Sequence, residues 1–306
     1  MSKTLLIVGG TGFIGRSLAE HSVQKGFKTI VLSLTEPKDN IKLHNVTYIQ
    51  ADITRLNELR GCLPQAPIDY VVNLSGYINH ADFLNGGRET LDTHFIGVQN
   101  LLQIIDWRTL RRFVQIGTSD EYGSQAAPQN EEMSARPISS YSVGKTASTL
   151  LLQTLFRTEA LPSVVLRLFL VYGPGQNNKR FLPQIINGCL SNAVFSVSAG
   201  QQLRDFCYID DVVDGIFLCL ENDNVNGEVI NLASGRAISI REAIEYISET
   251  IDGGNPEFGK IAYRAGENME LYADISKAQR ILDWKPKIKF EDGVNITVNH
   301  YRKEGN

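Results

Sequence analysis

Short apolar runs alternate with longer stretches of helical period through the first half of the chain. Strands are predicted at residues 5–9, 28–33, 46–51, 70–75, 112–117 and 163–169, and helices at about 13–25, 88–106 and 138–158. Strands that are apolar along their whole length are buried on both faces, which is typical of a parallel sheet covered by helices on both sides. The pattern therefore predicts an α/β fold built on a doubly wound parallel sheet.

The alternation is lost after Pro174-Gly175, where shorter and more mixed elements begin. Helices are expected at about 181–191, after the segment RDFCYIDD, and after Ser239. We therefore predict a main domain over residues 1–174 and a smaller C-terminal α/β lobe over 175–306, with the chain returning to the main domain around 205–235. Ligands of such sheets bind at the carboxyl ends of the strands, so the lobe is expected to close over that edge.

Composition indicates an ordinary globular protein of 306 residues, with 42% hydrophobic and 21% charged residues. The net charge of -4 gives no electrostatic reason to expect nucleic acid as a partner. The four cysteines have no C-x-x-C or histidine spacing that would suit a metal, which favours a reduced intracellular protein. No apolar run approaches the ~20 residues of a membrane span, so we expect a cytoplasmic protein without a membrane partner.

The segment VGGTGFIG follows the first predicted strand and opens the first predicted helix. Glycines at such a turn let the backbone approach a pyrophosphate, while the helix start offers free N–H groups and a partial positive charge. The alternative is a strand–helix turn that binds no nucleotide. A dinucleotide site is favoured by the position of the turn, and its predicted residues are Gly9, Gly12, Phe13, Ile14 and Gly15.

The second strand ends at Ser33, where folds of this kind that prefer NAD usually carry a carboxylate for the adenosine ribose. Ser33 and Lys38 favour a 2'-phosphate and hence NADP(H), whereas NAD(H) stays possible if Glu36 or the main chain binds the ribose. Asp52 and Ile53 are predicted to border the adenine, although Asp52 alternatively caps a helix. The end of the fourth strand, Leu74–Ser75, is assigned to the same cofactor site.

Tyr141 and Lys145 lie one turn apart on the helix predicted over 138–158. Lowering a tyrosine pKa from about 10 by about three units requires roughly 4 kcal/mol, which one ammonium about 4 Å away supplies at an effective dielectric constant of about 20. Two polar residues on a solvated helix face are the alternative. The inward side of this helix is predicted to carry the stripe Val143, Ala147, Leu150 and Thr154.

Thr118 ends the fifth predicted strand in the segment GTSDEYG, so its hydroxyl is expected at the same edge of the sheet as Tyr141. There it can hydrogen-bond a reacting sugar oxygen. A threonine at this position is alternatively a cap at the strand end.

Seven motifs in this order, GGTGFIG, GTSDEYG, YSVGK, VYGPGQ, RDFCYIDDVV, NLASG and LDWKP, resemble the extended short-chain dehydrogenase/reductase family that acts on nucleotide sugars. The resemblance covers almost the whole chain. It implies a Rossmann domain with a substrate-binding lobe, a nucleotide-diphosphate sugar as the substrate, and Tyr141 as the group that shuttles the proton. It further implies that Lys145 holds the cofactor ribose and that Thr118 shares the hydrogen bond to the substrate oxygen.

Within that family, dehydratases often have an Asp-Glu pair where this chain has Ser119 and Asp120. Asp120 alone remains a possible acid or base. The segments around Thr118 and Tyr141 are more similar to those of 4-keto reductases such as GDP-4-keto-6-deoxy-mannose reductase. We therefore favour reduction of a nucleotide-linked 4-keto-6-deoxy sugar, with 4-epimerisation or 4,6-dehydration as alternatives and a non-catalytic NADP-binding sensor as a further one.

The resemblance also suggests substrate contacts and an assembly. His80, Ser119, Arg204 and Arg264 are assigned to the substrate, with the two arginines on its diphosphate. Leu170 and His94 stand where the family commonly has Asn, and His94 is expected to be an interior histidine rather than a catalyst. A homodimer is expected through the helices at 88–106 and 138–158.

Overall fold

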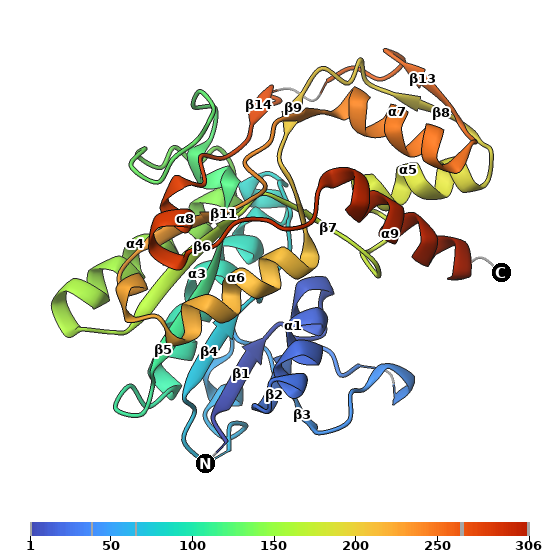
Figure 1. Cartoon of the computed structure of the whole chain (residues 1–306). Coiled ribbons are helices and arrows are strands. Elements are labelled where there is room, and N and C mark those ends of the chain that lie inside the picture. Colours follow the sequence, from blue (N-terminus) through green and yellow to red (C-terminus); the bar gives the residue numbers. More distant parts are fainter. Residues whose placement is uncertain (1, 38, 65, 264–265, 305–306) are drawn as a thin grey trace.

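The computed structural model describes residues 2–37, 39–64, 66–263 and 266–304 (Figure 1). Its centre is a seven-stranded sheet with the strand order β11-β6-β5-β4-β1-β2-β3, and every neighbouring pair in it is parallel. The strands are β1 (Thr4–Val8), β2 (Lys28–Ser33), β3 (Val46–Gln50), β4 (Tyr70–Asn73), β5 (Arg112–Thr118), β6 (Ser163–Leu168) and β11 (Val229–Leu232). The predicted α/β Rossmann-type fold is confirmed.

Alternate side chains of β1 enter two different hydrophobic cores. Leu5 and Ile7 belong to one core and Leu6 and Val8 to the other, and all four are fully buried. Successive side chains of a strand point to opposite faces of the sheet, so an apolar run requires a cover on both faces. Each of the six apolar runs of the sequence overlaps an observed strand, and burial accounts for five of them. The exception is β3, which lies at the edge of the sheet and is only partly buried.

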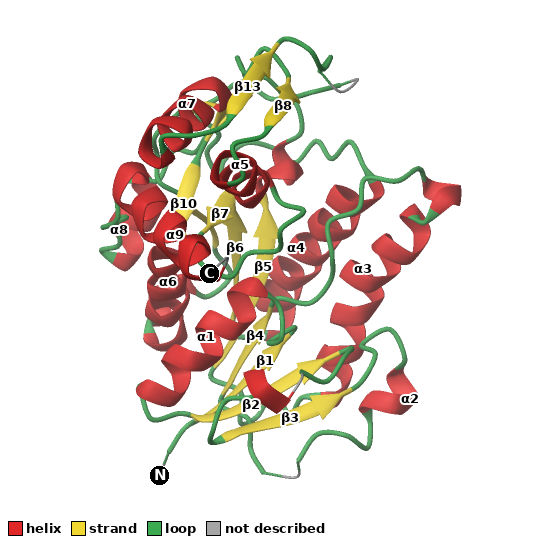
Figure 2. Ribbon diagram, turned by 90° about the vertical axis from the view of Figure 1, so that its right-hand side faces the viewer, coloured by secondary structure: helices red, strands yellow, loops and turns green. Residues whose placement is uncertain are grey.

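Two layers of helices provide these covers. In Figure 2, α1 and α6 lie on one side of the sheet and α2, α3 and α4 on the other. The bounds are α1 (Phe13–Gln24), α2 (Leu56–Leu59), α3 (Gly87–Ile104), α4 (Ser140–Glu159) and α6 (Ile209–Glu221). In sequence, α6 and β11 come after the first elements of the lobe. The chain therefore returns to the main domain over residues 209–232, where α6 covers the sheet and β11 pairs with β6 as its seventh strand.

Most of the remaining elements form the lobe at the top of Figures 1 and 2. The remaining helices are α5 (Phe181–Leu190), α7 (Ile240–Ile251), α9 (Phe290–Glu304) and α8 (Ser276–Leu282), of which α8 lies lower, against β11 and α6 of the main domain. Small sheets pair β7 (Leu170–Tyr172) with β10 (Phe206–Tyr208), β8 (Val194–Val197) with β13 (Asn255–Phe258), and β9 (Leu203–Arg204) with β12 (Ile238–Ser239) and β14 (Glu270–Leu271).

Two buried aspartates join distant parts of the chain around α6. The Asp205 carboxylate accepts hydrogen bonds of 2.6 Å from both the backbone N–H and the hydroxyl of Ser234. The Asp211 carboxylate accepts from the backbone N–H groups of Lys287 at 2.9 Å and Ile288 at 3.0 Å. Asp205 of the motif RDFCYIDDVV thus meets Ser234 of NLASG, and Asp211 of the first motif meets the backbone just after LDWKP.

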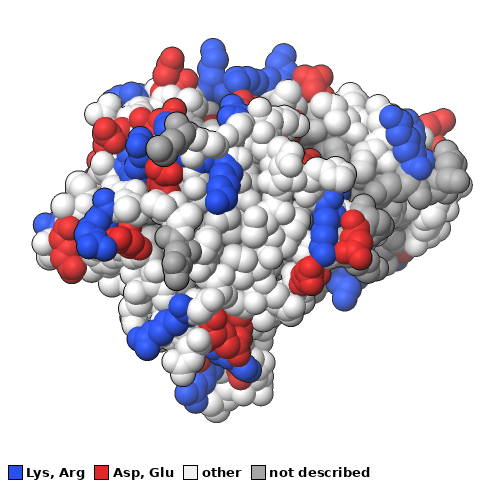
Figure 3. Space-filling view, turned by 90° about the horizontal axis from the view of Figure 1, so that it is seen from below, with Lys and Arg blue, Asp and Glu red and all other residues white. Residues whose placement is uncertain are grey.

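Charged side chains of both signs are interspersed on the face that Figure 3 shows, and broad uncharged areas separate them. This distribution agrees with the small net charge of the chain. Among the described residues, no helix combines the length and the apolar character that crossing a membrane would require.

Candidate active site

A cavity of about 700 Å³ lies at the carboxyl ends of β1, β2 and β4. It is lined by Val8 and Ser33, which end β1 and β2, by Gly9 after β1, and by Leu74 and Ser75 after β4. This edge of the sheet, beside the first strand–helix turn, is where doubly wound folds bind dinucleotides. The cavity therefore lies where the adenosine of such a cofactor would bind, and the backbone of the adjacent turn can bind its pyrophosphate.

The glycine turn keeps the backbone close to that cavity. Gly9 has a φ of +79°, and a Cβ atom there would lie 2.9 Å from the carbonyl carbon of Leu74. A Cβ on Gly15 would collide with the carbonyl oxygen of Gly9, so this glycine lets α1 pack against the turn. Gly12 precedes α1, and Phe13 and Ile14 begin it and pack on the core. These positions follow the pattern predicted for a cofactor turn.

The polar side chains predicted to contact the adenosine form hydrogen bonds with nearby backbone N–H groups. The Ser33 hydroxyl accepts a hydrogen bond of 3.2 Å from the Thr11 N–H. Asp52 accepts from the Thr54 N–H and hydroxyl at 2.9 and 2.7 Å and lines the cavity. It does not cap α2, whose N-cap is Arg55. Ile53 is buried, and Lys38 lies outside the described residues. Of the described residues that line the cavity, none is Lys or Arg.

The start of α4 positions the tyrosine and the lysine. Ser139 caps this helix by accepting a hydrogen bond of 3.2 Å from the Ser142 N–H, which places Tyr141 in the first turn. Tyr141 and Lys145 are both buried, with exposed fractions of 4% and 5%. They point into the molecule on the same side of α4, so the solvated-face alternative is wrong.

The apolar stripe of α4 faces the other way, and its predicted inward orientation is wrong. Val143 and Leu150 are 42% and 55% exposed, and Thr154 is exposed as well. Tyr141 and Lys145 lie on the buried side of α4 instead. Hydrogen bonds to residues at the edge of the sheet compensate for the burial of these polar groups. Such contacts between distant elements cannot be predicted from a hydrophobic pattern.

Tyr141 is hydrogen-bonded to the Thr118 side chain. Burial raises the pKa of Tyr141 well above its ordinary value, and the negative charge of Asp120 adds to this rise. The Thr118 hydrogen bond and the charge of Arg180 oppose it. The structure does not show the predicted lowering of this pKa by Lys145; burial raises it, because desolvation disfavours the phenolate.

Lys145 is held in the sheet edge rather than directed at the phenol. Its ammonium donates a hydrogen bond of 2.8 Å to the Ile116 carbonyl in β5. Burial lowers the pKa of Lys145 to about 8, and the charge of Glu121 opposes this shift. The side chain therefore remains mostly charged at neutral pH while it lies one turn from Tyr141.

A buried ion pair that the sequence analysis missed supports this arrangement. Glu121 is fully buried and lies 3.0 Å from Arg167. Its carboxylate also accepts hydrogen bonds from the Thr118 N–H at 3.0 Å and the Thr149 hydroxyl at 2.9 Å. It thereby links the end of β5 with α4. The only sequence signal for this ion pair was Glu121 itself, the second acid of GTSDEYG. The sequence does not show which of the two neighbouring acids is buried.

His94 is a buried histidine, as expected. Its Nε2 donates a hydrogen bond of 3.0 Å to the Tyr77 carbonyl, which fixes the proton on that nitrogen. Nδ1 has no hydrogen-bond partner in the described part of the chain. Burial lowers the pKa of His94 to about 3, so the ring is neutral at physiological pH. A Cβ at Gly76 or Gly144 would collide with or crowd this side chain.

His80 and Asp120 lie together beside Tyr141. The distance from His80 Nε2 to an Asp120 carboxylate oxygen is 3.7 Å, and the His80 ring is edge-on to the phenol at 5.6 Å between centroids. Thr118 accepts a hydrogen bond of 3.3 Å from the Asp120 N–H, so it acts as a cap in addition to contacting Tyr141. Ser119 is buried directly after it.

Of the two arginines predicted to bind the diphosphate, only Arg204 is among the described residues. Arg204 forms an ion pair with Glu267 and is largely buried, and its charge acts on Asp120. Arg264 lies outside the described residues. Leu170 is 37% exposed and begins β7. Arg180, just before α5, was not predicted, although its charge acts on Tyr141.

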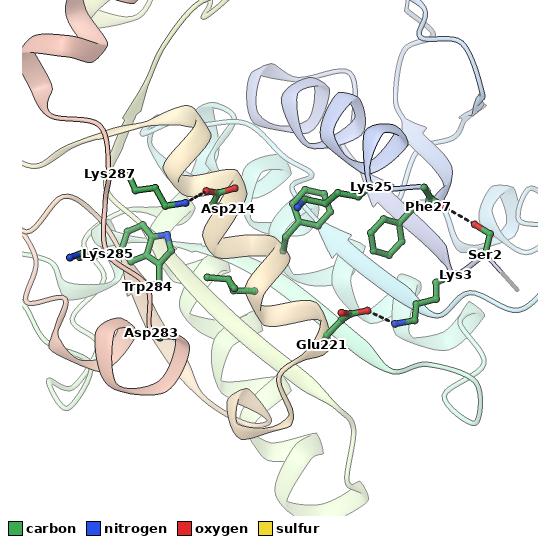
Figure 4. A pocket seen from close by; sticks show the side chains of 13 residues that line it. Ser2, Lys3, Lys25, Phe27, Asp214, Glu221, Asp283, Trp284, Lys285 and Lys287 are labelled. Atoms are coloured by element: carbon green, nitrogen blue, oxygen red, sulfur yellow. Dashed lines mark hydrogen bonds and ion pairs between the residues drawn. The ribbon is translucent and has the colours of Figure 1, made fainter.

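A second cavity, of about 860 Å³, lies at the opposite, amino-terminal end of β1 and β2 (Figure 4). Lys3 and Lys287 point along its wall and are paired with Glu221 and Asp214. Lys25 lies over the Phe217 ring at 5.1 Å. This end of a doubly wound sheet is away from the strand ends that bind ligands, and none of the tyrosine site residues lines the cavity.

The fold and the site together define a class: a dinucleotide-binding α/β enzyme with a tyrosine, a lysine and a threonine at the cofactor edge. A family model described as the NAD dependent epimerase/dehydratase family matches residues 5–233. The chain belongs to this family, which agrees with the nucleotide-sugar family that the motifs resemble.

Two curated relatives match along nearly their whole length. The chain is 29% identical to "UDP-glucuronate 4-epimerase" of Thermodesulfobacterium geofontis, covering 96% of this chain and 94% of that one. It is 26% identical to "dTDP-glucose 4,6-dehydratase" of Haemophilus influenzae, covering 97% of each. Among solved structures, UDP-glucose 4-epimerase of Thermotoga maritima with UDP-glucose superposes with a TM-score of 0.92 at 25% identity, covering 99% of this chain and 100% of that one.

Proposed function

We propose that this protein oxidises and re-reduces C4 of a nucleotide-linked hexose, with 4-epimerisation as the net reaction. The observation that carries the proposal is the Tyr141 hydroxyl, hydrogen-bonded to Thr118 and one helical turn from the charged Lys145, beside the glycine-lined cavity. The names of the similar proteins support an epimerase or a dehydratase better than the 4-keto reductase that the sequence motifs favoured.

The cavity suits a dinucleotide whose nicotinamide accepts and returns a hydride. We assign NAD to it, rather than the NADP(H) that Ser33 and Lys38 favoured; Lys38 lies outside the described residues. A 2'-phosphate requires a cation, and the described lining residues include the acids Asp52, Glu89 and Asp92 but no Lys or Arg. The Ser33 hydroxyl already accepts a hydrogen bond from Thr11.

Tyr141 would take the proton from the C4 hydroxyl of the sugar and return it after the ketone is re-reduced. Thr118 would hold the same oxygen through its hydroxyl. Since burial raises the pKa of Tyr141, the proton transfer needs positive charge close to the phenol. Arg180 provides one such charge, and an oxidised nicotinamide would add another, while Lys145 lies one helical turn away.

The experiment is to supply UDP-glucose, UDP-galactose and UDP-glucuronate without added cofactor and to measure interconversion of 4-epimers by NMR. We expect catalytic turnover that needs no stoichiometric nucleotide, and a loss of about a hundredfold or more in Tyr141→Phe with cofactor binding retained. Stoichiometric NADPH consumption with a 4-keto sugar, without any epimer, would instead establish the reductase.

We further propose that two copies pair through α3 and α4. Val143 and Leu150 on α4 are apolar and 42% and 55% exposed, which a second copy of the same face would cover. Leu150→Glu should convert the dimer to a monomer in light scattering. A monomeric wild-type protein at micromolar concentration would exclude this arrangement.

A further inference from the structure

The Glu121 carboxylate lies behind the site rather than in it. It is fully buried and accepts hydrogen bonds from the Thr118 N–H at 3.0 Å, the Thr149 hydroxyl at 2.9 Å and the Arg167 guanidinium at 3.0 Å. Gly117 makes room for it, since a Cβ there would lie 2.6 Å from a Glu121 carboxylate oxygen. Each oxygen of the carboxylate is thus bound inside the protein, and Glu121 has no direct contact with a substrate.

The first of these hydrogen bonds holds the threonine of the site. Thr118 caps the short helix η3 (Ser119–Tyr122), and the Glu121 side chain completes a capping box on the Thr118 N–H. Thr118 is also the residue that is hydrogen-bonded to Tyr141. Loss of the carboxylate would therefore release the backbone that carries the Thr118 hydroxyl.

The hydrogen bond from Thr149 extends this support to α4. Thr149 lies one turn after Lys145 on the buried side of that helix, and its hydroxyl is also 3.1 Å from the Lys145 carbonyl. A single carboxylate therefore connects the strand end that carries Thr118 with the helix that carries Tyr141 and Lys145.

Glu121 also acts on Lys145 through its charge. The Lys145 ammonium is buried, and its hydrogen-bond acceptor is the uncharged Ile116 carbonyl. Burial lowers the pKa of Lys145, and the negative charge of Glu121 opposes this lowering. The other titratable or charged groups in this region are Tyr141 on α4 itself, the neutral His94 on α3, Asp120 beside Glu121, and Arg167 on β6.

We propose that Glu121 is a positioning residue of the reaction, which fixes the Thr118 backbone against α4 and keeps Lys145 charged through its own negative charge. The inference rests on the proposed function and deepens it. It assigns to a residue outside the site the placement of Thr118 and the charge one helical turn from Tyr141. Arg167 compensates the carboxylate from β6, so Glu121 can stay ionised in the interior.

The test titrates Lys145 directly, through the carbon-13 resonance of its Cε in lysine-labelled protein, assigned by its absence in Lys145→Arg. In Glu121→Gln the titration midpoint should fall about one pH unit below that of the wild type, because the opposing charge is lost while Arg167 stays charged. Glu121→Asp keeps the charge and should stay near the wild-type midpoint. Glu291→Gln, which removes an exposed acid of α9, is the control and should leave the midpoint unchanged.

The positional role is read separately from the charge. The shorter side chain of Glu121→Asp should no longer hold Thr118, so hydrogen exchange of the Thr118 amide should become at least tenfold faster and kcat should fall about tenfold. In that variant the alkaline fall of kcat/KM should keep its wild-type position. In Glu121→Gln the same fall should move to lower pH together with the Lys145 midpoint.

A wild-type midpoint for Lys145 in Glu121→Gln would overturn the electrostatic role, and wild-type exchange at Thr118 in Glu121→Asp would overturn the positional one. If Glu121→Gln does not fold, as thermal unfolding would show, the double variant Glu121→Gln, Arg167→Met decides. It leaves no unpaired charge inside, and its midpoint should still lie below that of the wild type. Titration and exchange need no substrate, so failure of the epimerase assay alone would reject the proposed function and not the placement of Thr118 and Lys145 by Glu121.

Discussion

The imidazole of His94 stands edge-on to the phenol of Tyr141, with ring centroids 5.0 Å apart and an interplanar angle of 80°. The same imidazole donates a hydrogen bond to the Tyr77 carbonyl, and Tyr77 lines the cofactor cavity. One neutral buried ring therefore connects the tyrosine of the site with the wall of the cavity.

Burial of His94 predicts a pH dependence of stability. Its folded pKa is about 3, whereas an unfolded histidine has a pKa of about 6.5. Between these values the unfolded chain binds the proton and the folded protein does not, so this residue makes the protein less stable as pH falls below about 6.5. The free energy of unfolding should lose about 1.4 kcal/mol per pH unit from this group. Urea unfolding at pH 5.5, 6.5 and 7.5 measures it.

The variant His94→Gln isolates that contribution, since glutamine can donate to the Tyr77 carbonyl but does not titrate. The difference in unfolding free energy between wild type and variant should shrink or change sign as pH falls from 7.5 to 5.5. A difference that stays constant over this range would mean that His94 is protonated in the folded protein.

The buried pair of Glu121 and Arg167 should be sensitive to removal of one partner. Glu121→Gln leaves Arg167 charged and nearly fully buried, and the loss expected for breaking such a pair is about 3 to 5 kcal/mol. Urea unfolding at pH 7 measures the loss. The double variant Glu121→Gln, Arg167→Met should recover part of it, because no unpaired charge is then left inside.

An exposed pair serves as the comparison. Arg236 and Glu291 are 2.7 Å apart with side chains that are 58% and 35% exposed. Glu291→Gln should change the free energy of unfolding by at most about 1 kcal/mol. Equal losses in Glu121→Gln and Glu291→Gln would show that burial does not govern the strength of the inner pair.

Lys145 should set an alkaline limit on turnover. Its pKa of about 8 means that the ammonium loses its proton as pH rises through that value, and the positive charge one helical turn from Tyr141 disappears. The rate kcat/KM should therefore fall above about pH 8. In Lys145→Arg the guanidinium keeps its charge, so this variant, although slower, should lack the fall. A wild-type profile that stays flat to pH 9.5 would contradict the assignment.

The sequence predicted most of the sheet because its signal is local. Fully apolar runs of strand length and a glycine turn after the first of them are sufficient for a doubly wound fold. The short strands of the lobe, such as β9 and β12, have two residues each and carry no periodicity. Their pairing depends on distant partners, which is information that a hydrophobic pattern lacks.

The sequence predicted that Tyr141, Lys145 and Thr118 meet at one edge of the sheet, but it did not predict their electrostatics. Tyr141, Lys145 and Thr118 are brought together at the carboxyl edge of the sheet. The spacing of Tyr141 and Lys145 indicated an activating charge, while the structure adds a larger opposing effect, burial of the phenol. How deeply a side chain is buried depends on the packing of several elements, and Glu121 was missed for the same reason.

The glycine turn allows the cost of a close contact to be separated from that of backbone strain. Gly9 and Gly26 share a φ of +79°, but a Cβ at Gly9 would lie 2.9 Å from the Leu74 carbonyl carbon, whereas one at Gly26 would meet nothing within 4 Å. Gly26→Ala should lower the free energy of unfolding by about 1 to 2 kcal/mol and leave cofactor affinity unchanged. Gly9→Ala should lose more stability and weaken NAD binding, measured by calorimetry, at least tenfold. Equal effects of the two substitutions on NAD affinity would show that the close contact between Gly9 and Leu74 is not the reason why this position needs glycine.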